Sequence, residues 1–213
     1  MSKGHTHSKG LGNFAKDFLS FLSDQEYIEH GVEIDWIPKV RVILCNDDLW
    51  NQLWGILGQL PRHNLNEYMT PIATTFDNWN KTNGSCWAPL SKDETGKVRG
   101  VPEDTRLEVA IKMGFPRELL EELRPCDALI FLHESNLRLA EQVQRFYGEA
   151  TFPSRHHSVV AHECIHIMDA LSGKFTVEQF DSLMSFEAHA VAHLIKSFVD
   201  PMTLEEFKKR YCS

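Results

Sequence analysis

The pattern of apolar and polar residues predicts a chain that mixes strands with helices. Residues 40–45 and 127–133 are short apolar runs rich in branched side chains, which is typical of β-strands. The second run is almost entirely apolar, so we expect it to lie in the centre of a sheet. Shorter extended segments are expected at residues 85–88 and 98–101, and residues 107–111 are a further strand candidate.

Helical spacing of apolar residues marks other segments. Residues 11–22 predict one amphipathic helix, and a second is expected after Asn46, whose side chain suits an N-cap. Further helices are expected over residues 134–147, 158–171, 182–198 and 203–211, with a short one beginning at Thr176. Residues 61–105 are the least regular part, and a long irregular stretch in a compact domain is often functional.

Size, composition and charge limit the classes of protein to consider. With 213 residues, 42% of them hydrophobic and 24% charged, the chain resembles one soluble globular domain. A net charge of −8 without a basic cluster argues against a nucleic-acid partner. No apolar run is long enough to predict a membrane span. Residues 1–10 are polar, lack a signal segment and are expected to form a disordered tail.

The cysteines bear on the cellular compartment. They are five in number, scattered, and form no CxxC pair: Cys45, Cys86, Cys126, Cys164 and Cys212. This pattern predicts reduced, mostly buried thiols in a cytoplasmic or other reducing compartment. Export as an effector without a cleavable signal stays open, and the sequence does not indicate an oligomeric state.

The candidate chemistry lies in residues 158–173, which contain His162-Glu163-Cys-Ile-His166. On a helix, two histidines four residues apart leave the same face and can hold one zinc ion. Glu163 is about 100° around the helix from His162, within reach of a water on the metal without being a ligand. Asp169 lies one turn beyond His166, where it could accept the proton on the far nitrogen of a ligand histidine. The opposite face is apolar, as in a buried helix.

A catalytic zinc usually has three protein ligands and an open position. Ser172 stands where one class of HExxH enzymes has a third histidine, six residues after the second, which excludes that class. Farther along, the helix expected at 182–198 offers Glu187 or the pair His189 and His193. Glu187 falls within the apolar stripe of this helix, whereas both histidines fall near the opposite side. Since a buried carboxylate is very costly unless compensated, Glu187 is the preferred third ligand. The histidine pair, and a buried hydrogen bond or ion pair of Glu187, remain alternatives.

These motifs resemble the gluzincin branch of the zincin metallopeptidases. HExxHxxD, followed 21 residues after His166 by Glu187 in a Phe-Glu-Ala-x-Ala-x-Ala segment, is most similar to toxin-type members such as the anthrax lethal factor catalytic domain. The matching residues cover about 158–173 and 183–198.

The resemblance implies an α+β, zincin-like fold in which residues 11–213 form a single domain. A small mixed-sheet lobe, about residues 36–157 together with the active-site helix 156–171, would pack on a helical lobe formed by residues 174–213. The zinc site would lie in the cleft between the lobes, beside an edge strand that pairs with an extended peptide.

One position departs from the family pattern. Toxin-type members carry a tyrosine about two turns before the glutamate, and such a residue stabilises the oxyanion; the corresponding residue here is Phe180. Tyr147, Arg155, His156 and His157 are possible substitutes, although packing or solvent exposure is the simpler role for each.

The sequence therefore predicts a zinc metallopeptidase, specifically an endopeptidase, that hydrolyses protein or peptide substrates. Zinc would lower the pKa of its bound water, and Glu163 would carry the water's proton to the leaving amine. Two alternatives stay open: a zinc-stabilised regulatory or binding domain without turnover, which Phe180 favours, and a zinc hydrolase of a non-protein substrate.

Overall fold

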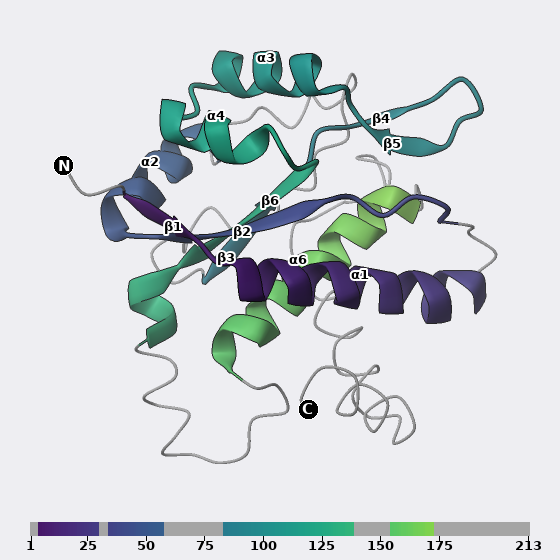
Figure 1. The fold of residues 1–213 in the computed structure, drawn as a ribbon, viewed down its shortest axis with the longest axis horizontal. Helices are drawn as coiled ribbons and strands as arrows, with labels where there is room; N and C mark the ends of the chain where they lie inside the picture. The colour runs from purple at the N-terminus through teal and green to yellow at the C-terminus, as the bar shows by residue number, and fades with distance from the viewer. Residues whose placement is uncertain (1–3, 30–33, 58–82, 139–153, 173–213) are drawn as a thin grey trace.

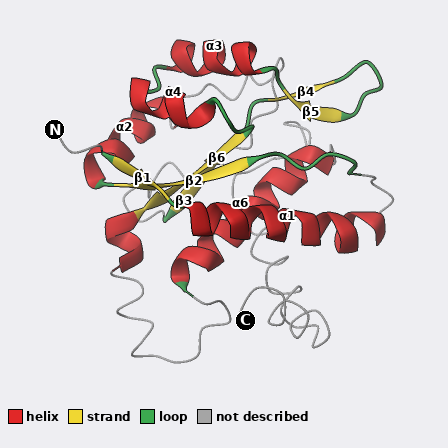
Figure 2. Ribbon diagram, in the orientation of Figure 1, coloured by secondary structure: helices red, strands yellow, loops and turns green. Residues whose placement is uncertain are grey.

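The computed structural model describes residues 4–29, 34–57, 83–138 and 154–172 (Figure 1). Its main sheet has four strands in the order β1-β2-β6-β3, and β4 and β5 form a separate hairpin. The strands are β1 (His5–His7), β2 (Val40–Cys45), β3 (Gly84–Trp87), β4 (Leu90–Lys92), β5 (Val98–Gly100) and β6 (Ala128–His133). Helices and strands are mixed along the chain (Figure 2), which confirms the α+β class at this level.

The main sheet is mixed in direction. Its central strands β2 and β6 run parallel, with Val40 opposite Ala128 and Cys45 opposite His133. The outer strands are antiparallel to their neighbours, β1 to β2 and β3 to β6. Every residue of β6 is buried, as expected for a run that is apolar at nearly every position. The central place predicted for this strand is confirmed.

Helices cover both faces of the sheet (Figure 1). On one face pack α1 (Lys9–Glu29) and α6 (Arg155–Ser172); on the other lie α2 (Asp47–Leu57), α3 (Glu103–Met113) and α4 (Arg117–Leu123). Because side chains alternate across a strand, Ile130 and Leu132 join the core under α1 and α6. Leu129 and Phe131 join the core under the other helices. The sheet is therefore the middle layer of three.

The N-terminal residues differ from the predicted disordered tail. Strand β1 pairs with the outer edge of β2, with His5 opposite Cys45, and α1 already begins at Lys9. His5 is buried, and its Nε2 lies 3.5 Å from Oε1 of Glu122 on α4. The sequence Gly-His-Thr-His has no apolar alternation, so backbone pairing with β2 orders it rather than a hydrophobic pattern.

Residues 107–111 belong to helix α3, so the strand predicted there is wrong. Glu103 and Asp104 place acidic side chains in the first turn, directly after Pro102. Gly114 ends the helix in the left-handed conformation, with a φ of 85°. These start and stop signals outweigh the four apolar residues among positions 107–111, because so short a segment fits a helix as well as a strand.

The other predicted elements in the described residues are present. Asn46 caps α2, since its Oδ1 accepts a hydrogen bond of 3.0 Å from the backbone N–H of Leu49. Helix α1 extends beyond the predicted 11–22, and α6 includes the predicted 158–171. The helices predicted after Gly173 lie outside the described residues, as does most of the one predicted at 134–147.

The cysteines of the described residues are buried: Cys45, Cys86, Cys126 and Cys164. Burial raises the pKa of Cys126 to about 12, and it also raises the pKa values of Cys45 and Cys164. These three thiols therefore stay protonated and unreactive near neutral pH. The prediction of buried thiols is confirmed for these four residues, and Cys212 lies outside the described part.

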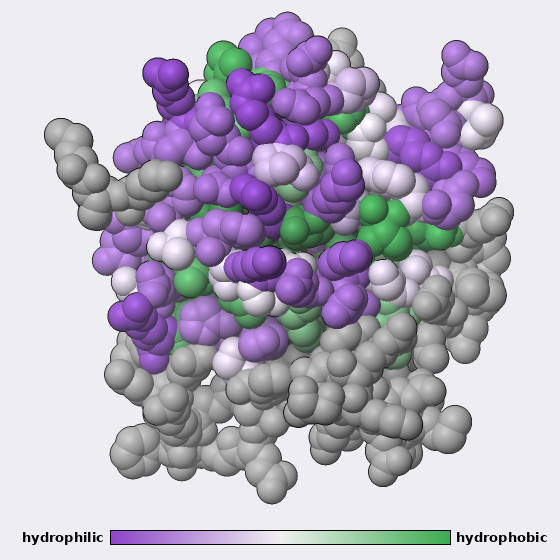
Figure 3. Space-filling view, viewed as in Figure 1, coloured by the Kyte–Doolittle hydropathy of each residue, from purple (hydrophilic) through white to green (hydrophobic). Residues whose placement is uncertain are grey.

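The surface seen in Figure 3 is mainly hydrophilic, and apolar side chains form only small areas on it. Within the described residues, Ile111 on α3 is the only exposed large hydrophobic side chain. None of the helices described has the length and apolar character needed to cross a membrane.

Candidate metal centre

Helix α6 carries the HExxH motif and packs against both α1 and the outer strand β3. Its first turn is capped by Ser154, whose Oγ accepts a hydrogen bond from the backbone N–H of His157. From Val159 to Asp169 every residue except His162 is buried. The motif therefore lies in the protein core, with one of its residues reaching toward the surface.

The two histidines of the motif converge on one point. Their Nε2 atoms lie 2.9 Å apart, and the rings are nearly perpendicular, with an interplanar angle of 86°. His166 is fully buried, whereas His162 is partly exposed. The spacing of four residues thus brings the two rings together as predicted, with the same nitrogen of each ring directed at its neighbour.

This geometry fits a zinc ion. Nitrogen ligands lie about 2.0–2.1 Å from zinc, so two of them in a tetrahedral site are roughly 3.3 Å apart. Moving from 2.9 Å to that separation requires only small rotations of the two rings. His162 and His166 would hold the metal through their Nε2 atoms.

Glu163 lies on the side of α6 that faces β3. Its side chain is buried, with 3% of the residue exposed, and Oε1 would be 3.2 Å from a Cβ built on Gly84. The carboxylate is therefore held between the helix and the strand, a quarter-turn away from the two imidazoles. Its charge adds to the burial that raises the pKa of Cys164. A buried carboxylate is stabilised by a nearby positive charge, which a metal beside it would supply.

Asp169 lies one turn beyond His166 and is fully buried. Its backbone carbonyl accepts a hydrogen bond of 2.7 Å from the hydroxyl of Ser172, close to the end of the helix. The predicted hydrogen bond between the Asp169 carboxylate and a ligand histidine stays a prediction.

The third ligand falls in a part of the chain that is not described. Glu187, His189, His193 and Phe180 all lie within residues 173–213. Across residues 4–29, 34–57, 83–138 and 154–172, no three His, Cys, Asp or Glu side chains gather into a metal-binding group. Of the three predicted metal ligands, the described residues contain His162 and His166, and Glu187 stays a prediction.

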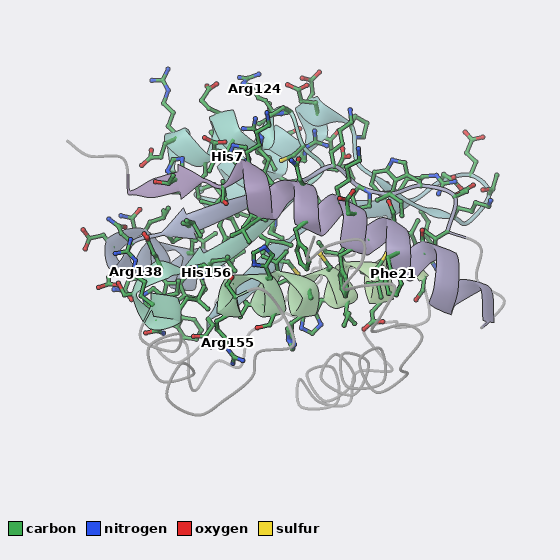
Figure 4. The ribbon with its side chains drawn as sticks, turned by 60° about the horizontal axis from the view of Figure 1, so that its bottom comes forward. His7, Phe21, Arg124, Arg138, Arg155 and His156 are labelled. Carbon is green, nitrogen blue, oxygen red and sulfur yellow. The ribbon has the colours of Figure 1, made fainter. Side chains whose placement is uncertain are left out.

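Three candidates for oxyanion stabilisation lie at the start of α6. Arg155 is exposed and points away from the sheet (Figure 4). His157 has its Nδ1 2.7 Å from the Ser154 hydroxyl, and its ring packs edge-on against Phe14 on α1. His157 thus has a structural role between two helices. His156 is partly exposed, and Tyr147 lies outside the described residues.

Gly84 is a residue of this site that sequence reasoning did not single out. The Asn83-Gly84 dipeptide and the extended segment after it were visible as a turn followed by a strand. What the sequence could not show is that this strand start lies against Glu163, a residue 79 positions farther along the chain.

Comparison with known proteins gives no relative. No family model matches the chain, and no curated protein or solved structure matches it.

Proposed function

We propose that this protein is a zinc-dependent metallopeptidase that hydrolyses peptide bonds. The proposal rests above all on one observation: the Nε2 atoms of His162 and His166 lie 2.9 Å apart on the helix that also buries Glu163. Histidine Nε2 is a common zinc ligand, and HExxH on a helix supplies two ligands and a general base together. Glu187 completes the ligand set in this proposal, as the sequence predicts.

The protein's own residues supply positioning and proton transfer. When bound, zinc lowers the pKa of a coordinated water and polarises a carbonyl group. Glu163 would accept a proton from the attacking water and deliver it to the nitrogen of the leaving amine, which would regenerate its carboxylate.

The proposed substrate is an extended peptide. Strand β3 is the outermost strand on its side of the described sheet, and its first residue is next to Glu163. An extended chain can add to a sheet edge through main-chain hydrogen bonds. A peptide on β3 would run past Glu163, which favours hydrolysis of an extended segment.

The experiment that tests this proposal compares the wild type with Glu163→Gln. Both proteins are loaded with zinc, dialysed, analysed for metal, and incubated with a peptide mixture whose new N-termini are mapped. We expect about one zinc per chain in both, and turnover lower by about 10²-fold or more in the variant, since only proton transfer is lost. Equal cleavage by both proteins would contradict the assignment of Glu163 as the base.

The same assay separates the alternatives. A wild type that holds zinc but cleaves no peptide would instead favour the regulatory domain or the hydrolase of another substrate. Loss of zinc from Glu163→Gln would show that Glu163 is a ligand.

A further inference from the structure

Gly84 and helix α6 are in unusually close contact. A Cβ built on Gly84 would lie 2.4 Å from Cγ1 of Val159 and 3.2 Å from Oε1 of Glu163. Real Cβ atoms essentially never approach another heavy atom within 3.0 Å. A larger residue at position 84 therefore forces the helix and the strand apart, since a packed interior offers little free volume.

The added methyl group would also contact the neighbouring strand. The same Cβ would lie 3.4 Å from Cδ2 of Leu132 on β6, the strand to which β3 is hydrogen-bonded. Gly84 is directly opposite Leu132 in that pairing. Because its pairing with β6 holds β3 in the sheet, we expect the displacement to be taken up mainly by α6 or by its side chains.

We propose that Gly84 is a positioning residue for Glu163, an inference that rests on the proposed peptidase function. Val159 and Glu163 are four residues apart and share one face of α6, so the contact that excludes a side chain at position 84 also sets where the carboxylate lies. The missing side chain lets the strand backbone approach the helix and holds Glu163 at a fixed distance from the two imidazoles.

The test uses a compensating pair of substitutions. Gly84→Ala adds the methyl group, and Val159→Ala removes the atom that this methyl would strike. The Gly84→Ala variant should have a lower melting temperature and a kcat reduced by about 10-fold or more at an unchanged KM, because misplacing a catalytic group by about 1 Å can cost 10²-fold. In the double variant the melting temperature should return to that of Val159→Ala, while kcat stays reduced, since the 3.2 Å contact with Glu163 remains.

Gly100→Ala is the matched control for stability. A Cβ on Gly100 would lie 2.8 Å from Cη2 of Trp36, so this variant also meets a steric clash, but it does not touch the HExxH residues. It should lower the melting temperature and leave kcat unchanged. A double variant that regains both its melting temperature and full kcat, or a Gly84→Ala protein that has wild-type kcat when fully folded, would overturn the proposal.

Crystal structures of the wild type and the double variant provide a measurement that does not depend on turnover. The carboxylate of Glu163 should move away from its wild-type position relative to His162 and His166; an unmoved carboxylate would overturn the inference. If the wild type binds zinc but cleaves nothing, the proposed function fails, and this structural comparison alone decides the role of Gly84.

Discussion

His133 and His166 are both buried imidazoles, but they face different groups. His133, at the end of β6, stacks on Trp50 with an interplanar angle of 6°, and its Nε2 lies 2.8 Å from Oδ1 of Asp47. The Asp47 side chain is 67% exposed, so the pair reaches solvent through its acidic partner. The hydrogen bond from His133 is the main reason that the pKa of Asp47 lies below its ordinary value.

His166 faces a second imidazole instead of a carboxylate. Its Nε2 is 2.9 Å from that of His162, and Glu163 is buried on the adjoining face of the same helix. An imidazole and a carboxylate form a stable pair by themselves, because a donor meets an acceptor. Two imidazoles whose Nε2 atoms converge could instead hold one cation, as the proposed function requires. Burial is common to the two histidines, so the group that each ring faces is what distinguishes the proposed ligand His166 from His133.

The largest effect that separates the two sites is expected in zinc binding. His166→Ala and Glu187→Ala should each weaken zinc binding by far more than the 10- to 100-fold typical of a residue that only supports a ligand. Asp169→Asn should weaken it by about that smaller factor, and His189→Ala and His193→Ala should leave it intact. The amount of zinc that each variant retains after dialysis against a mild chelator tests this order of effects. If His189→Ala or His193→Ala empties the site while Glu187→Ala does not, the choice of Glu187 is wrong.

The next largest effect is expected on stability, when the metal is removed. A ligand present at about 1,000 times its Kd stabilises the folded state by about 4 kcal/mol. A strong chelator should therefore lower the melting temperature of protein that is first shown to contain zinc. No thermal shift on such protein would show that the metal does not tie α6 to a second part of the chain.

At the His133 site we expect a smaller effect, which is limited to the stability of the fold. His133→Ala removes the ring stacked on Trp50 and should lower the free energy of unfolding by about 2 kcal/mol. His133→Phe keeps an aromatic ring there and loses only the bond to Asp47, so it should cost less. Both variants should keep full zinc content. Urea denaturation measures the loss of stability, and metal analysis measures the zinc content. Loss of zinc from either would remove the distinction between the two sites.

The smallest effect concerns an ion pair remote from both histidines. Lys97 and Arg99 on the β4–β5 hairpin are 2.8 Å and 2.7 Å from Asp35 and lower its pKa to about 2. Because the folded state lowers this pKa, the contribution to stability is present above pH 4 and lost as the pH falls from about 4 to 2.

The contribution should be small because the carboxylate is exposed to solvent. Asp35→Asn should reduce the pH dependence in that interval and leave stability near pH 7 only slightly changed. To measure the contribution of the ion pair, the melting temperatures of wild type and variant are compared from pH 2 to 5. A difference that does not vary with pH would show that the ion pair contributes nothing.

Much of the local structure could be read from residue patterns. The apolar run that ends at His133 forms the central strand β6. Asn46 caps α2, as its side chain predicts. The prediction failed where apolar periodicity was short or absent. Residues 107–111 fit two structures equally, and the polar β1 is held by backbone pairing with β2.

For the candidate site, the sequence by itself determined which side chains share one face of α6. The helical repeat alone brings His162 and His166 together and sets Glu163 beside them, because residues four apart are neighbours on any helix. Only the tertiary structure decided what lies on the other side of Glu163. The approach of Gly84 depends on the pairing of β3 with β6 and on the packing of α6 beneath them, contacts between segments far apart in the chain that no local pattern encodes.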